Sequence, residues 1–160
     1  MKMESLSKFF RRERAGHRLY WLTTDIAIAR EPADADLPGL HAAGVRGILD
    51  LRAEMPERSE LASAAGLRYL RVPVVEGDAP TPAELRLATG WVKDRIAAEG
   101  PVLVHCREGR GRSAMVACAT LVGLGIPLFD AYQALRRARP DVALNDVQDE
   151  ALRLFSQSQS

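Results

Sequence analysis

Apolar residues follow two patterns along this chain, and together they predict strands and helices in alternation. Short, nearly continuous apolar runs are typical of strands buried on both faces of a sheet. The clearest such run is "PVLVH", residues 101–105, which we place at the centre of the sheet. Residues 19–28 read as a short pair of strands with a turn near Thr24 and Asp25. The remaining predicted strands cover residues 45–52 and 67–75.

Helical spacing of apolar residues fills the intervals between the strands and continues to the end of the chain. The best-marked helix begins after Thr81, which has the residue type of an N-cap, with Pro82 at the first helical position and Glu84 at the capping-box position. Its apolar stripe continues to about Glu99. The other predicted helices cover residues 35–44, 56–66, 112–124, 128–138 and 146–155.

This alternation predicts an α/β fold. We expect a central, mostly parallel sheet of about four to five strands, flanked by helices on both faces. The chain of 160 residues has the length of one domain. We divide it into a basic arm at residues 1–18, a folded domain at 19–156 and a disordered tail at 157–160.

The composition changes this picture little, except at the N-terminus. With 47% hydrophobic and 27% charged residues and a net charge of +1, the chain resembles a soluble globular protein and predicts no nucleic-acid partner. The absence of a long apolar stretch predicts a cytoplasmic location. Residues 1–18 carry six Lys or Arg against two Glu, a net charge of +4, with apolar residues at helical spacing. Such an arm either packs on the domain, which we favour, or makes weak contact with a membrane surface.

The chain has only two cysteines, Cys106 and Cys118, which favours a reducing compartment and free thiols. Apolar neighbours place Cys118 in a buried helix core. The three histidines, His17, His41 and His105, are scattered without the spacing of metal ligands, so we expect no metal site.

The segment "VLVHCREGRGRS", residues 102–113, combines a buried strand, a glycine-punctuated loop and a helix start. That order turns backbone N–H groups toward one point, which makes an anion site. Gly109 and Gly111 allow a tight loop, and Arg112 offers a forked pair of N–H donors for a phosphate. Cys106 lies at the floor of this cradle, where the positive surroundings favour thiolate over thiol.

These residues resemble the signature of the cysteine-dependent protein tyrosine phosphatases, in particular their compact dual-specificity and lipid phosphatase branch. The signature, His-Cys, five residues, Arg and then Ser or Thr, is matched by His105, Cys106, Arg112 and Ser113. The resemblance implies a phosphatase-like P-loop between a central strand and a helix. It also implies a metal-independent phosphomonoester hydrolase that needs no cofactor.

The resemblance assigns a role to each matched residue. Cys106 attacks phosphorus and forms a cysteinyl-phosphate, while Arg112 binds the phosphate and stabilises its oxygens in the transition state. Ser113 hydrogen-bonds the sulfur and helps it leave, and His105 orients the loop from below. The residues expected to surround the phosphate are Arg107, Glu108, Gly109, Arg110, Gly111 and Arg112.

The general acid is expected on an upstream loop, where the family carries an aspartate about thirty residues before the cysteine. Here "VPVVEGDAPTPAEL" holds two carboxylates. Glu76 falls at the family's usual spacing, whereas Asp78 has the usual residue type two positions later. The sequence leaves both residues as candidates.

The sequence leaves open which substrate is used and whether the chain has another function than phosphate hydrolysis. Arg107 and Arg110 favour a substrate with additional negative charge, such as a phosphoinositide or another phospholipid, with a phosphorylated protein as the other expected partner. A rhodanese-like sulfur transferase also places a cysteine in an anion-binding loop, and a phosphate-binding module without catalysis would keep the cradle. Neither alternative accounts for the whole pattern, because the first does not need an acidic loop and the second does not need the thiol.

Overall fold

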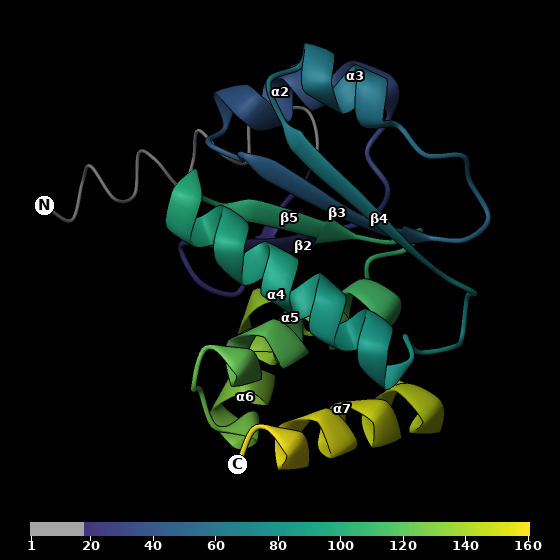
Figure 1. Cartoon of the computed structure of the whole chain (residues 1–160), viewed down its shortest axis with the longest axis vertical. Helices are drawn as coiled ribbons and strands as arrows, with labels where there is room; N and C mark the ends of the chain where they lie inside the picture. Colours follow the sequence, from purple (N-terminus) through teal and green to yellow (C-terminus); the bar gives the residue numbers. More distant parts are fainter. Residues whose placement is uncertain (1–17) are drawn as a thin grey trace, which may run out of the picture.

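The computed structural model describes residues 18–160, so the predicted basic arm lies almost entirely outside the described residues. A five-stranded sheet runs through the middle of the molecule in the order β1-β2-β5-β3-β4 (Figure 1). Only β1 is antiparallel to its neighbour, and the other pairs are parallel. The mostly parallel sheet predicted from the sequence is confirmed. The strands are β1 (Tyr20–Trp21), β2 (Ile26–Ala29), β3 (Gly47–Arg52), β4 (Arg68–Val74) and β5 (Val102–His105).

Helices cover both faces of the sheet, as predicted (Figure 1). The lower layer in Figure 1 is the thicker, and its helices pack against the larger of two apolar clusters. On the thinner side lie η1 (Asp34–Asp36), α2 (Leu37–Ala42) and α3 (Ser59–Ala64). On the thicker side lie α4 (Pro82–Ala98), α5 (Arg112–Gly123), α6 (Leu128–Ala138) and α7 (Asp146–Ser158).

The side chains of β5 alternate between the two apolar clusters. Val102 and Val104 belong to the larger cluster, which also contains most of α5, whereas Leu103 belongs to the smaller one. All four residues of β5 are fully buried, as expected for a strand covered on both faces. The carboxyl end of this strand is therefore held rigidly from both sides, and the segment that follows it starts from a fixed position.

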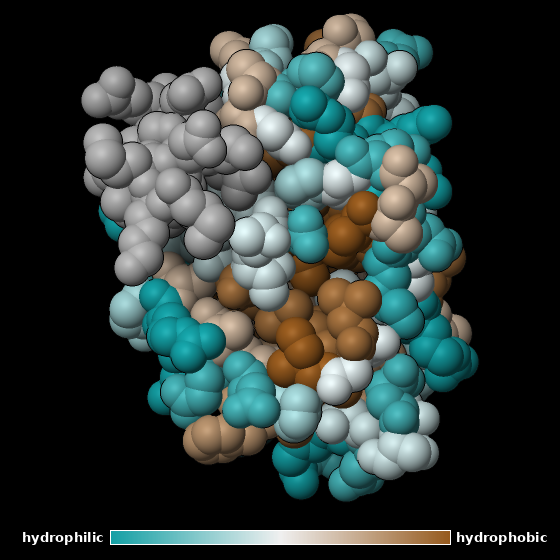
Figure 2. Space-filling view, turned by 90° about the vertical axis from the view of Figure 1, so that its left-hand side faces the viewer, coloured by the Kyte–Doolittle hydropathy of each residue, from teal (hydrophilic) through white to brown (hydrophobic). Residues whose placement is uncertain are grey.

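Leu124 and Phe129, near the junction of α5 and α6, remain exposed. On the face seen in Figure 2, apolar side chains gather at the centre and polar side chains lie around them.

None of the helices among residues 18–160 has the length and apolar character needed to cross a membrane.

Most predicted helix starts agree with the structure, but the helix predicted from residue 56 begins at Ser59, and the predicted end of the last helix is wrong. Thr81 caps α4 by accepting a hydrogen bond from the Glu84 N–H, in the capping box read from the sequence. The last helix continues to Ser158, so the first two residues of the predicted tail at 157–160 are helical. Phe155 packs into the core, and Ser158 Oγ donates to its carbonyl, which stabilises this additional turn.

Cys118 lies in the middle of α5 and is fully buried, and both cysteines are free thiols, as predicted. Burial raises the pKa of the Cys118 thiol to about 12, so the reactive thiolate is scarce at neutral pH. We expect a thiol reagent such as iodoacetamide to leave Cys118 unlabelled in the folded protein and to label it after denaturation. Peptide mass spectrometry measures this directly, and rapid labelling of Cys118 in native buffer would contradict the assignment.

Candidate active site

The predicted phosphate-binding loop connects β5, which ends at His105, to α5, which begins at Arg112. It lies at the carboxyl edge of the parallel strands, where open α/β sheets place their ligands. The Cys106 side chain is almost completely buried at the base of this loop. Its sulfur accepts a hydrogen bond from the Gly109 N–H at 3.3 Å, and Ser113 Oγ lies 3.3 Å from the same sulfur. The loop therefore curls around the thiol as the sequence predicted.

Every backbone carbonyl from residue 106 to residue 110 is held on the outside of the loop by a donor that is not part of the loop. In a trans peptide the C=O and the following N–H point in opposite directions, so outward carbonyls leave inward N–H groups. These inward N–H groups form the anion cradle. The donors are His105 Nδ1 for Cys106, the Glu31 N–H for Arg107, Arg139 Nη1 for Glu108 and Gly109, and the Ala143 N–H for Arg110.

Gly109 is the one residue of the loop for which only glycine fits. Its φ is +74°, and a Cβ there would lie 2.5–2.7 Å from backbone atoms of Ala29 and Arg30 at the end of β2. This close approach brings the Gly109 N–H to the sulfur.

Arg112 is held by partners that leave its phosphate-binding edge available. Glu54 accepts hydrogen bonds from Nη1 and Nη2, each at 2.7 Å, and the Val74 carbonyl accepts a second bond from Nη1. These contacts use three of the five N–H bonds of a guanidinium, and the Nε–H and one Nη2–H remain as an adjacent pair. Hydrogen bonding to Arg112 lowers the pKa of Glu54 to about 2, so the pair is charged at neutral pH. The two available N–H bonds of the Arg112 guanidinium are thus oriented before a phosphate binds.

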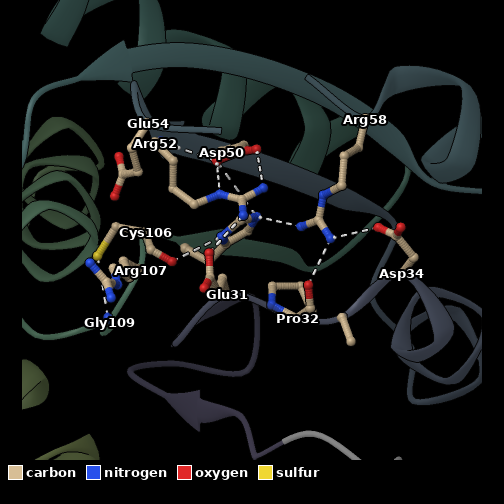
Figure 3. A network of polar contacts seen from close by, with 12 residues as sticks. Glu31, Pro32, Asp34, Asp50, Arg52, Glu54, Arg58, Cys106, Arg107 and Gly109 are labelled. Carbon is tan, nitrogen blue, oxygen red and sulfur yellow. Dashed lines mark hydrogen bonds and ion pairs between the residues drawn. The ribbon is translucent and has the colours of Figure 1, made fainter. Parts of the chain in front are cut away.

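A buried polar network lies beneath the loop at the end of β3 (Figure 3). Asp50 accepts hydrogen bonds from the Arg52 side chain and from the Tyr69 hydroxyl, the latter at 2.6 Å. Arg52 in turn pairs with Glu31, whose backbone N–H holds the Arg107 carbonyl. Burial opposes ionisation of Asp50, but hydrogen bonds from Arg52 and from the Tyr69 hydroxyl bring its pKa down to about 2. The network anchors one side of the phosphate loop to the sheet.

His105 is fully buried between this network and the loop. Arg58 Nη2 lies 3.4 Å from Nε2 of the imidazole, and because a guanidinium can only donate, Nε2 must be the acceptor. The proton then sits on Nδ1, which donates to the Cys106 carbonyl. Burial lowers the pKa of His105 to about 4, so the ring is neutral near pH 7. The imidazole thus contacts the backbone at the start of the phosphate loop, and its orienting role stays a prediction.

The two candidate acids on the loop after β4 lie in different surroundings. Glu76 lies beside the rim of the phosphate loop, with its Oε2 3.9 Å from Arg107 Nη1. Hydrogen bonding to Glu54 raises the pKa of Arg112. Asp78 instead accepts a hydrogen bond from the Ala79 N–H and lines an apolar groove between the start of α4 and α7. The structure thus separates two residues that the sequence left equivalent.

The rim of the cradle carries Arg107 and Arg110, both about half exposed. Arg107 faces Glu76, and Arg110 lies 3.6 Å from Glu108 and 3.8 Å from Asp141. These ion pairs are long and solvated, so each of the two cations can turn toward an anionic substrate at little cost. Within residues 18–160, no three Asp, Glu, His or Cys side chains gather as a set of metal ligands.

Several site residues were not identified from the sequence. Glu54 follows β3, and the parallel pairing of β3 with β5 brings it to Arg112. The sequence did contain a sign of the buried network. Asp50 and Arg52 interrupt the apolar run "ILDLR", and two opposite charges inside a buried strand indicate an ion pair. Arg139, which donates to the Glu108 and Gly109 carbonyls, and Asn145, whose Nδ2 donates to the Gly77 carbonyl, gave no comparable signal. They reach the site only through the packing of α6 and α7.

Comparison with known proteins agrees with this geometry. The family model Tc-R-P, described as "Polymorphic toxin system, DSP-PTPase phosphatase", matches residues 24–125. The phosphatidylglycerophosphate phosphatase PTPMT2 of Arabidopsis thaliana is 30% identical over 133 residues, which cover 81% of this chain and 58% of that protein. Human dual specificity phosphatase 28 is 38% identical over 79 residues, which cover 48% of this chain and 45% of that protein. The chain thus spans less than two thirds of either relative.

Solved structures of phosphatases share the fold along nearly their whole length. Tk-PTP in its active form superimposes with a TM-score of 0.79 at 27% identity, covering 87% of this chain and 96% of Tk-PTP. PTPMT1 in complex with PI(5)P gives a TM-score of 0.81 at 23% identity, covering 88% and 96% of the two chains. From the signature around Cys106, the fold and the family match, we conclude that the chain belongs to the DSP-PTPase family, the dual-specificity and lipid phosphatases of the cysteine-dependent tyrosine phosphatase superfamily.

Proposed function

We propose that this chain hydrolyses phosphate monoesters through a cysteinyl-phosphate intermediate, with Cys106 as the nucleophile. The observation that carries the proposal is the Cys106 sulfur at the base of a loop whose Gly109 N–H donates to it and whose Arg112 keeps two N–H bonds available for a phosphate. Neither a sulfur transferase nor a phosphate-binding module without catalysis is favoured by the family match.

In the first step the substrate phosphate occupies the cradle, and the Nε–H and free Nη2–H of Arg112 bind its equatorial oxygens. The Cys106 thiolate forms an S–P bond while the P–O bond to the leaving group breaks. Protonated Glu76 gives its proton to the leaving oxygen. We assign this role to Glu76 because its carboxylate lies 3.9 Å from Arg107 Nη1 at the rim of the phosphate loop, whereas Asp78 lines the outer groove.

In the second step a water molecule attacks phosphorus, and the Glu76 carboxylate takes the proton from that water. The S–P bond breaks and returns the thiolate. Ser113 donates its hydroxyl proton in a hydrogen bond to the departing sulfur, which its distance of 3.3 Å allows. Inorganic phosphate then leaves the cradle, and the site returns to its starting state.

For the substrate, we propose a phosphate monoester with a second negative group close by, of the phosphatidylglycerophosphate type. Exposed Arg107 and Arg110 at the rim provide the extra cations, and PTPMT2, a relative at 30% identity, carries that activity in its name. Phosphotyrosine in proteins is the second candidate, because other relatives are dual-specificity protein phosphatases.

Cys106→Ser tests the nucleophile. We expect the rate on p-nitrophenyl phosphate, measured with a chelator present, to fall roughly 10³-fold or more, because a serine at this site lacks the reactive thiolate. Binding of inorganic phosphate, measured by calorimetry, should persist because the N–H ring and Arg112 remain. Cys118→Ala is the matched control and should keep its activity. Turnover of thiosulfate and cyanide by the wild type, without phosphatase activity, would instead indicate a sulfur transferase.

Glu76→Gln and Asp78→Asn test the general acid. Removing the acid should slow an alkyl phosphate about 10²-fold or more, but p-nitrophenyl phosphate much less, because p-nitrophenolate leaves without a proton. The same variant should lose the fall in rate at high pH that reflects deprotonation of the acid. We expect this behaviour from Glu76→Gln and a small, uniform effect from Asp78→Asn. The reverse pattern would assign the acid to Asp78.

Arg107→Ala combined with Arg110→Ala tests the substrate class. On vesicles containing phosphatidylglycerophosphate we expect KM to rise several-fold, up to about tenfold, while KM for p-nitrophenyl phosphate changes little, because only the first substrate carries a second anionic group. The double variant Arg136→Ala with Arg137→Ala removes the same charge from the exposed side of α6 as a control. Faster hydrolysis of phosphotyrosine peptides than of any phospholipid would assign the enzyme to phosphoproteins.

A further inference from the structure

The segment from Arg139 to Gln148, which joins α6 to α7, touches both loops of the candidate site. One end of it contacts the phosphate loop, and the other end contacts the loop that carries Glu76. Neither the signature around Cys106 nor the roles proposed above account for these contacts. We call residues 139–148 the bridging segment.

Arg139 makes the contact with the phosphate loop. A single nitrogen, Nη1, donates to the carbonyls of Glu108 and Gly109 at 2.9 and 3.1 Å. The guanidinium is itself fixed, because its carbon lies 4.5 Å from the centre of the Tyr20 ring and its Nε donates to Asp141 at 2.9 Å. Only 11% of the side chain is exposed. Arg139 thus holds two of the outward carbonyls on which the cradle depends.

A backbone contact continues the same connection. The Ala143 N–H donates to the Arg110 carbonyl at 3.0 Å. Three consecutive carbonyls of the phosphate loop, from residue 108 to residue 110, are therefore held by the bridging segment alone. Without these donors the same carbonyls could turn inward and repel an anion.

Asn145 and Gln148 make the contact with the acid loop. Asn145 Nδ2 donates to the Gly77 carbonyl at 2.8 Å, and Gln148 Nε2 donates to the Asp78 carbonyl at 3.2 Å. Gln148 is nearly fully buried, and its amide packs against Gly111 of the phosphate loop. The two residues also form the capping box of α7, so their side chains have fixed positions.

We propose that the bridging segment positions both loops of the active site, with Arg139 holding the anion cradle open and Asn145 holding Glu76 over it. The proposal rests on the phosphatase function proposed above. The two residues act through different loops, so their loss has different effects. Loss of Arg139 weakens oxyanion binding for every substrate. Loss of the Asn145 contact spares binding and slows only the step that needs the acid.

The cradle is tested with Arg139→Ala, with Arg137→Ala near the end of α6 as the matched control. Affinity for inorganic tungstate, a phosphate mimic, is measured by calorimetry, which requires no turnover. We expect affinity to fall about tenfold or more in Arg139→Ala, equivalent to roughly 1.4 kcal/mol, and to stay within about twofold in Arg137→Ala. Equal affinities in the two variants would overturn the role of Arg139. If Arg139→Ala does not fold, Arg139→Lys keeps the charge but cannot reproduce the fixed geometry, and the same comparison applies.

The acid loop is tested with Asn145→Ser. Serine can still accept the hydrogen bond that caps α7, but it has no amide to reach Gly77. We expect unchanged tungstate affinity, faster hydrogen exchange in residues 76–78, and a loss of kcat that is about fivefold or more larger on an alkyl phosphate than on p-nitrophenyl phosphate. Unchanged exchange, or equal losses on the two esters, would overturn the role of Asn145.

These measurements separate the inference from the proposed function. A wild-type protein that binds tungstate but hydrolyses no phosphate monoester would refute the function, while the tungstate and hydrogen-exchange comparisons would still decide the positioning roles. A wild-type protein that hydrolyses both esters, with variants indistinguishable from the controls, would refute the positioning roles and leave the function standing.

Discussion

The active site depends on one constraint, which is that the carbonyls of residues 106–110 point away from the Cys106 sulfur. Because each peptide is planar, this orientation turns a series of N–H groups toward the same point and creates a site for an anion. Converging N–H dipoles repel one another, so the loop does not hold this shape unaided. It needs hydrogen-bond donors on its outer side, and the fold provides them.

Those donors come from both sides of the loop. On the sheet side, His105 and the backbone of Glu31 hold the first two carbonyls, and the buried pair of Asp50 and Arg52 fixes Glu31 in turn. On the other side, Arg139 and the backbone N–H of residue 143 hold the next three. The cradle thus needs the sheet and the helical layer together, which explains why the catalytic loop lies between them.

Charge in the site is arranged so that little has to move when a phosphate binds. Glu54 fixes the Arg112 guanidinium and leaves one edge free, so the cost of orienting the arginine is met during folding. His105 stays neutral because it is buried and faces Arg58, and it therefore donates to the Cys106 carbonyl without adding a charge beneath the sulfur. Such preorganisation suits a reaction in which negative charge moves between the sulfur, the phosphate and the leaving oxygen.

The sequence by itself determined the features that depend on neighbouring residues. The strand, loop and helix around Cys106, the nearby Arg112 and Ser113, and the capping box of α4 all lie within short segments whose conformation follows from local chemistry. The alternation of apolar runs likewise determined the layered, mostly parallel sheet, because buried strands need cover on both faces.

Only the tertiary structure decided the features that join distant segments. Glu54 lies 58 positions from Arg112 and reaches it because β3 and β5 pair in parallel register. Arg139 and Asn145 meet the two loops only because α6 and α7 pack beside them. Glu76 and Asp78 differ by two positions, yet the turn between them brings one beside Arg107 at the rim of the phosphate loop and the other to a groove. In each case the deciding quantity is a direction or a distance in space, which residue spacing does not encode.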